Sequence, residues 1–139
     1  MASTSVSKTV PASPERVWEL IGGFGSLPDW LPFITESTLA EGGRVRRLKS
    51  SDGGEITERL VAFSETEHSY SYTILRAPFP VAGYIATLRV HPVAGQDNLA
   101  EVQWSGRFTP TGAATEQEVV DLFTGIFRDG LDALSNTVA

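Results

Sequence analysis

The amino-acid sequence predicts an α+β fold in which a curved, seven-stranded antiparallel sheet wraps around one long C-terminal helix. Short runs of β-branched and aromatic residues recur from Phe33 to Pro110, and turn-forming residues separate them. One more such run lies near the N-terminus, and the C-terminal segment has apolar residues at helical period. A sheet with one apolar face needs such a helix to cover it.

The N-terminal part is predicted to contain one strand and two short helices. Thr4 to Val10 alternate polar and apolar side chains, which is typical of a half-buried strand. Ser13-Pro14-Glu15 supplies an N-cap, a first-turn proline and a first-turn acid, so a helix is expected from there to Gly22-Gly23. Ser26 to Pro32 leave room for one further helical turn before the chain becomes extended.

Six strands and a long helix are predicted for the rest of the chain. The strands are separated by turn signals at Glu41-Gly42-Gly43, Asp52-Gly53-Gly54, Glu65-Thr66-Glu67, Ala77 to Val81 and Gly95 to Asn98. This close spacing favours antiparallel connections. The helix is expected over Thr115 to Thr137, because Thr115 and Glu118 form a capping box. Its apolar stripe comprises Val119, Leu122, Phe123, Ile126, Phe127, Leu131 and Leu134.

Length and composition limit the class of protein. A chain of 139 residues suits one domain, residues 1–139, and its 41% hydrophobic and 20% charged residues are typical of globular proteins. No apolar run approaches the ~20 residues needed to span a bilayer. Because Met1 to Val10 lack the charged and apolar regions of a signal peptide, a cytoplasmic location is expected.

The net charge and the scarcity of metal-ligating residues argue against a nucleic-acid-binding protein and against a metalloprotein. The net charge of −6 repels phosphate backbones, so a nucleic-acid partner is not expected. The chain has no cysteine, and its two histidines, His68 and His91, lie too far apart in sequence to suggest a metal cluster. Neither a metal nor another cofactor is expected.

Strand alternation predicts which side chains face the helix, since residues two apart share a face. Trp104 is placed inward, and Trp18 and Trp30 are assigned to the core. Because one helix cannot easily fill the space inside a curved sheet, an internal cavity is expected. The predicted ligand-binding residues are Phe33, Arg46, Leu48, Glu58, Tyr72, Ile74, Phe79, Tyr84, Leu88, Trp104, Leu122, Phe123 and Ile126.

Glu58 is the most informative of these residues, because its strand parity carries a carboxylate into the cavity. A buried carboxylate must be hydrogen-bonded, paired or raised in pKa. In the simpler interpretation Glu58 is a structural acid satisfied by Arg46, a tyrosine hydroxyl or water. In the alternative it anchors a ligand or acts as a general base, with Tyr72 as a second candidate catalytic residue. For Arg46 itself, an exposed position is favoured over the cavity mouth.

A family resemblance rests on segments that include Pro14-Glu15-Arg16-Val17-Trp18, Trp30-Leu31-Pro32, Glu58-Arg59-Leu60 and Val102 to Phe108. Together they resemble the polyketide cyclase/dehydrase branch of the SRPBCC superfamily, the START and Bet v 1-like proteins. The resemblance implies a helix-grip fold and a hydrophobic ligand. It does not imply one activity, because the branch holds cyclases, lipid carriers and the plant abscisic-acid receptors.

The resemblance to the plant receptors also implies roles for individual segments. Glu58 and Tyr84 match receptor positions that point into the pocket, Lys49 to Gly54 match the gate loop, and Ala77 to Val81 match the latch loop. Leu31 stands where the receptors have the lysine that neutralises the hormone's carboxylate, and the latch lacks their His-Arg pair. These departures argue against abscisic acid and against a receptor-like phosphatase partner.

Three functions stay open on the sequence. The first is a carrier or sensor of a polyketide, a terpenoid or a lipid-like molecule. The second is a cyclase/dehydrase-type enzyme, in which Glu58 takes a proton beside a ketone and Tyr72, Tyr84 or Arg46 stabilises the enolate. The third is a ligand-gated interaction module that exposes Phe79, and a homodimer through the same loops is left open.

Overall fold

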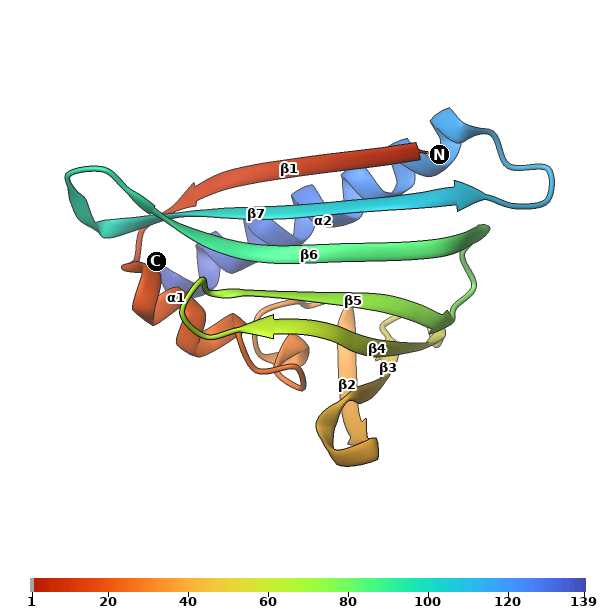
Figure 1. Ribbon diagram of the computed structural model, residues 1–139, viewed down its shortest axis with the longest axis horizontal. Coiled ribbons are helices and arrows are strands. Elements are labelled where there is room, and N and C mark those ends of the chain that lie inside the picture. The colour runs from red at the N-terminus through yellow and green to blue at the C-terminus, as the bar shows by residue number, and fades with distance from the viewer. Residues whose placement is uncertain (1) are drawn as a thin grey trace.

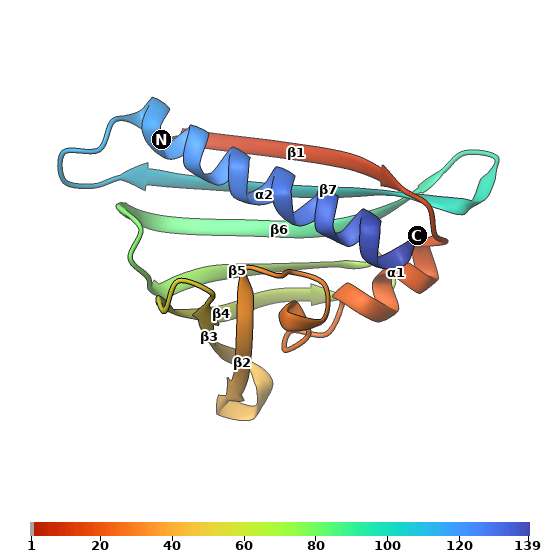
Figure 2. The same cartoon turned by 180° about the vertical axis from the view of Figure 1, so that it is seen from behind.

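The computed structural model describes residues 2–139 and shows a seven-stranded antiparallel sheet with a long helix across one face (Figures 1 and 2). The strands are β1 (Ala2–Val10), β2 (Ile34–Ala40), β3 (Val45–Ser50), β4 (Glu55–Ser64), β5 (Ser69–Arg76), β6 (Val81–Val93) and β7 (Gln96–Pro110). The helices are α1 (Pro14–Ile21) and α2 (Glu116–Val138), with 3₁₀ turns η1 (Leu27–Asp29) and η2 (Glu41–Gly43). The predicted fold class is confirmed.

The sheet has the order β1-β7-β6-β5-β4-β3-β2. From β2 to β7 each strand pairs with the next along the chain, as the short turns predicted. The first strand instead pairs with the last, with Ala2 opposite Phe108 and Val10 opposite Ala100. Figure 2 shows α2 crossing the face of β1, β7 and β6, with α1 beside the C-terminal end of α2.

Both helices begin at the predicted caps. The Ser13 hydroxyl accepts a hydrogen bond from the Arg16 backbone N–H at 3.2 Å, and Pro14 occupies the first turn. At α2 the Thr115 hydroxyl accepts from the Glu118 N–H at 3.1 Å, and the Glu118 carboxylate accepts from the Thr115 N–H at 3.0 Å. The hydrogen bond from the Thr115 backbone N–H lowers the pKa of the Glu118 carboxyl most, and the Thr115 side chain lowers it further.

Two glycines of α2 have opposite surroundings. A Cβ on Gly130 would lie 2.6 Å from Trp104 Cζ3 and 3.1 Å from Leu31 Cδ1, so the helix approaches the sheet closely because this residue has no side chain. Gly125 has no heavy atom within 4 Å of the corresponding position. Close packing therefore explains why position 130 holds a glycine, and it gives no reason for the glycine at position 125.

The strand parity set from Trp104 is confirmed along three neighbouring strands. Tyr70 and Tyr72 of β5, alternate residues from Tyr84 to Val90 of β6, and alternate residues from Val102 to Phe108 of β7 are all buried. Trp18 and Trp30 are also buried, as expected for core residues. The inner face of the sheet is therefore a continuous layer of apolar and aromatic side chains.

Three boundaries differ from the prediction. The first strand begins at Ala2 rather than Thr4, and the second short helix is only the 3₁₀ turn η1. The turn placed at Gly95 to Asn98 is wrong beyond Gly95, because β7 already begins at Gln96 and pairs there with Val93. Gly95 has a φ of 75°, so a tight turn forms without the polar residues that follow. Within residues 2–139 no helix has the length and hydropathy needed to cross a membrane.

Candidate functional site: a narrow cavity with a buried ion pair

A narrow cavity lies between the inner face of the sheet and α2. Its volume is about 50 Å³, which is room for a few water molecules. Aromatic side chains occupy much of the space that the curved sheet encloses; Tyr84, for example, packs 4.9 Å from Phe123 between ring centres. The lining residues are Leu27, Leu31, Phe33, Ile34, Arg46, Leu48, Ile56, Glu58, Tyr72, Ile74, Phe79, Tyr84, Trp104, Phe123, Ile126 and Phe127.

The structure brings together all the predicted ligand-binding residues except Leu88 and Leu122. Leu88 is buried on β6 but does not line the cavity. Leu122 is 38% exposed and does not line the cavity, so its assignment to the cavity wall is wrong. The buried residues of α2 follow the line Val119, Phe123 and Phe127, and Leu122 lies to the side of that line. Whether the remaining residues bind a ligand stays a prediction.

Sequence reasoning missed five of the lining residues. Ile56 and Phe127 carried a usable signal, since Ile56 shares strand parity with Glu58 and Phe127 belongs to the helical stripe. Leu27, Leu31 and Ile34 come from the segment around η1 and the start of β2. That segment has no repeating period, so the sequence could not indicate which side chains turn inward.

Arg46 is buried, contrary to the exposed position that was favoured for it. Only 1% of its surface is accessible. Its Nε donates to Glu58 Oε1 at 2.8 Å, and its Nη2 lies 2.8 Å from the same oxygen. Its Nη1 donates to the Phe24 carbonyl at 3.1 Å and to the Tyr70 hydroxyl at 3.3 Å. The guanidinium can be buried because its charge and most of its N–H groups have partners.

The pairing of β3 with β4 explains this ion pair. Arg46 and Glu58 stand directly opposite each other in the antiparallel register, and both point to the inner face. Aromatic rings enclose the guanidinium, with its carbon 4.1 Å from the centre of Phe24 and 4.7 Å from that of Tyr72. The simpler interpretation of Glu58, an acid satisfied by Arg46, thus matches the observed geometry.

Polar atoms remain free on the cavity side of this pair. Both contacts from Arg46 reach Oε1 of Glu58, and no other group of residues 2–139 makes a hydrogen bond to Oε2. Burial raises the pKa of the Glu58 carboxyl, and the Arg46 guanidinium opposes that shift. The cavity therefore contains one carboxylate oxygen able to accept a hydrogen bond.

Two tyrosines supply hydroxyl groups to the cavity. The Tyr72 hydroxyl accepts a hydrogen bond from Trp104 Nε1 at 3.1 Å. The pKa values of Tyr72 and Tyr84 are both raised, mainly by burial and further by the nearby Glu58 carboxylate. Both hydroxyls therefore stay protonated at neutral pH. The Tyr84 hydroxyl donates to that of Tyr72, so it is Tyr72 that can donate to a bound molecule.

An apolar groove on the surface adjoins the cavity. It has a volume of about 380 Å³ and is lined by Leu31, Pro32, Phe33, Ile126, Asp129, Gly130 and Ala133. Leu31, Phe33 and Ile126 line both spaces, so their side chains form the partition between them. Phe33 is 37% exposed and Ile126 only partly buried, so this partition lies at the surface of the molecule.

The loops that match the receptors' gate and latch, residues 49–54 and 77–81, lie near each other. In the first loop the Asp52 carboxylate accepts hydrogen bonds from the Ser50 hydroxyl and the Gly54 N–H. These bonds lower the pKa of Asp52. Pro78 of the second loop lies within 4 Å of the position of a Gly54 Cβ. The neighbouring Phe79 lines the cavity, with its ring 5.3 Å from that of Phe123. Phe79 is therefore not the exposed contact that an interaction module would present.

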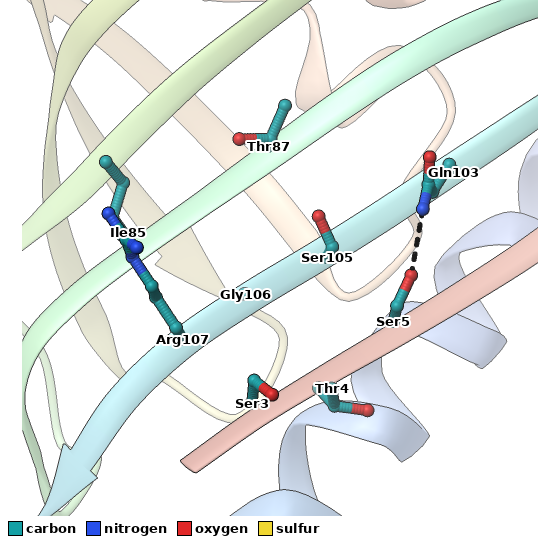
Figure 3. Close-up of a pocket in the computed structure, with 9 residues that line it drawn as sticks. All are labelled: Ser3, Thr4, Ser5, Ile85, Thr87, Gln103, Ser105, Gly106 and Arg107. Atoms are coloured by element: carbon teal, nitrogen blue, oxygen red, sulfur yellow. Dashed lines mark hydrogen bonds between the residues drawn. The ribbon is translucent and has the colours of Figure 1, made fainter. Parts of the chain in front are cut away.

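The opposite face of the sheet carries a larger but chemically different hollow, shown in Figure 3. It has a volume of about 560 Å³ and lies over β1, β7 and β6. Ser5, Ser105 and Thr87 stand opposite one another across these strands, and Gln103 donates to Ser5 at 3.1 Å. This open hollow has short hydroxyl side chains and no buried charge, so the cavity on the inner face is the better candidate site.

The curved sheet, the covering helix and the internal cavity define a START-like protein. A START superfamily protein from Mycobacterium smegmatis has this fold, with a TM-score of 0.80 at 15% identity over 98% of this chain and 96% of that one. The family model described as polyketide cyclase/dehydrase and lipid transport matches residues 1–139, and the chain belongs to this family.

Two solved structures are much more similar in sequence. The protein XoxI from Bacillus cereus is 50% identical over 98% of this chain and 94% of its own, with a TM-score of 0.94. A protein from Bacillus thuringiensis is 49% identical over 97% of both chains, also with a TM-score of 0.94. Comparison with curated protein sequences gave no significant match.

Proposed function

We propose that this protein binds a hydrophobic small molecule between the sheet and α2 and acts as its carrier or sensor. The observation that carries the proposal is the partition of Leu31, Phe33 and Ile126, which separates a cavity of about 50 Å³ from an apolar groove of about 380 Å³. Sites for drug-sized ligands have volumes of roughly 300–1,000 Å³. Movement of Phe33 and Ile126 joins the two spaces into a site of that size.

The lining of the joined site fits a polyketide, a terpenoid or a lipid-like molecule. Aliphatic and aromatic side chains form most of its wall. The charged side chains are Arg46 and Glu58 in the cavity and Asp129 in the groove. Such a site orients a largely apolar ligand by one polar end. The family to which the chain belongs includes lipid transport, which supports a carrier. We propose the cytoplasm as its location, with which a chain that forms no disulfide is compatible.

The second candidate function is a cyclase/dehydrase-type reaction. The free Oε2 of Glu58 favours it, because a general base needs an accessible lone pair. The Arg46 contact at 2.8 Å works against it, since a neighbouring cation makes the carboxylate a weaker base. An enzyme would lose turnover in Glu58→Gln and keep its substrate affinity. A carrier would change in affinity and convert nothing.

Binding of the neutral fluorescent dye Nile red tests the proposal. We expect its fluorescence to rise with the wild-type protein. We expect Ile126→Trp, which fills the partition, to weaken dye binding about tenfold or more, a change of about 1.4 kcal/mol. Asn136→Trp is the matched control, because Asn136 is exposed on the same helix and lines neither space. Failure of the wild-type protein to bind the dye, or equal binding by Ile126→Trp, would overturn the proposal.

A further inference from the structure

We infer that the ligand of this cavity is an uncharged molecule that presents a hydroxyl hydrogen to Glu58 and that carboxylic acids are selected against. The inference rests on the proposed function and specifies the chemistry of the same site. It depends on three features: the neutrality of the Arg46–Glu58 pair, the one carboxylate oxygen left free, and the charges of the other lining residues.

The ion pair leaves no net charge for a ligand to neutralise. Arg46 and Glu58 are the only charged residues among those that line the cavity, and they contact each other at 2.8 Å. A charged ligand would have to leave water without gaining a counter-ion, which is costly in a buried site. The cavity, in contrast to the groove with its Asp129, therefore favours an uncharged end of the ligand.

The free polar atoms match a hydroxyl group in particular. Oε2 of Glu58 can only accept a hydrogen bond. The Tyr72 hydroxyl already accepts from Trp104 and Tyr84, and it can donate its own hydrogen. A ligand hydroxyl both donates and accepts, so it satisfies the two atoms together. A hydrogen bond to an ionised group is about twice as strong as a neutral one. A hydrocarbon would leave Oε2 without a partner.

A carboxylate group on the ligand would be repelled at the same place. Its oxygens would face Oε2 of Glu58, and two like charges in a poorly solvated site repel strongly. The Arg46 guanidinium offers it little, because Glu58 balances its charge and the contacts to Glu58, Phe24 and Tyr70 leave only one N–H, on Nη2. At the mouth, Asp129 adds a further negative charge to the groove. Both ends of the joined site therefore disfavour an acid.

Three matched bicyclic compounds test the inference: 2-naphthol, naphthalene and 2-naphthoate, each used to displace Nile red at pH 7. We expect 2-naphthol to bind about ten- to a hundredfold more tightly than naphthalene, the range for a net hydrogen bond to a charged group. We expect 2-naphthoate to bind more weakly than both. If the dye binds but 2-naphthol shows no advantage, or 2-naphthoate binds most tightly, this inference fails while the proposed function stands. If no compound or dye binds, both fail.

Two variants assign the selectivity to the ion pair. In the double variant Arg46→Met/Glu58→Leu, apolar side chains of similar size replace both charges, which buried sites tolerate well. We expect it to bind naphthalene and 2-naphthol equally. Glu58→Gln leaves Arg46 without its counter-ion, so its binding of 2-naphthoate relative to naphthalene should rise. A double variant that keeps the preference for 2-naphthol would contradict the role of Glu58, whether or not Glu58→Gln folds.

Discussion

Two arginine–glutamate ion pairs, one on each face of the sheet, have the same N···O distance and very different surroundings. Arg46–Glu58 on the inner face and Arg89–Glu67 on the outer face are both joined at 2.8 Å. The side chains of the inner pair are 1% and 9% exposed, and those of the outer pair 41% and 59%. Solvent screens the outer pair, while the inner pair must satisfy two desolvated charges by itself. Distance alone therefore says little about how much each pair matters.

The same contrast extends to the neighbours of the two pairs. Aromatic rings and one backbone carbonyl enclose the inner guanidinium. The outer face carries short hydroxyl side chains beside its ion pairs, as the Ser71–Thr87 hydrogen bond at 2.7 Å illustrates. On the inner face the cavity has room for only a few water molecules to compensate for a change, whereas the outer face can rehydrate fully. The predictions below test this difference and, with two glycines of α2, the packing of the helix on the inner face.

The largest expected effect is that of Glu58→Leu. This change leaves the buried Arg46 without its counter-ion, and we expect the free energy of unfolding to fall by about 3–5 kcal/mol. The double variant Arg46→Met/Glu58→Leu should recover most of that loss, because neither charge is then buried. Urea unfolding of the wild-type protein and both variants measures the difference. A double variant no more stable than the single one would mean that packing, and not the orphaned charge, causes the loss.

Gly130→Ala is expected to have the next largest effect. Its Cβ would clash with Trp104 and approach Leu31, and overpacking of this kind costs about 1–3 kcal/mol. The better helix propensity of alanine offsets up to about 1 kcal/mol of that cost. We expect a net fall in the midpoint of urea unfolding. An unchanged midpoint would show that α2 can shift away from the sheet without penalty.

Gly125→Ala should act in the opposite direction. Nothing lies within 4 Å of the added carbon, so only the backbone preference changes. We expect a gain of about 0.5–1 kcal/mol in the free energy of unfolding. The two alanine variants on one helix thus serve as controls for each other in the same urea experiment. Destabilisation by Gly125→Ala would indicate that its local flexibility is part of the folded structure.

The smallest effect is expected for Glu67→Gln in the outer pair. Exposed pairs contribute about 0–1 kcal/mol, and 0.5 M salt should remove most of what remains. Thermal unfolding of Glu67→Gln and the Glu58 variants, each at low and high salt, measures both the size of the loss and its dependence on salt. A loss comparable with that of Glu58→Leu would remove the distinction between the two faces.

Much of the fold could be predicted because local signals agreed with one another. The Ser13 and Thr115 caps began both helices where expected, and alternation around Trp104 oriented three strands. The placement of Glu58 on the inner face followed from the same alternation. These features depend on residues close together in sequence, which is the range over which period and capping act.

The burial of Arg46 could not be predicted in this way. An arginine is exposed in most proteins, and only the register that places it opposite Glu58 makes burial tolerable. Leu122 failed for a related reason, because the helical stripe does not show which of its edges the sheet covers. The size of the cavity depends on how Tyr84, Phe123 and their neighbours interlock, and the sequence contains no measure of that packing.

The pairing of β1 with β7 has a consequence for how the chain is synthesised. The first strand leaves the ribosome early, and its partner follows about a hundred residues later, which takes several seconds at ~5–20 residues per second. During that interval its hydrogen-bonding edges have no native partner and are open to other chains. Serine, threonine and lysine occupy six of the nine positions of β1, and these polar side chains favour hydration of the strand before β7 is synthesised. We expect this polar composition of β1 to limit pairing with other chains while the molecule is incomplete.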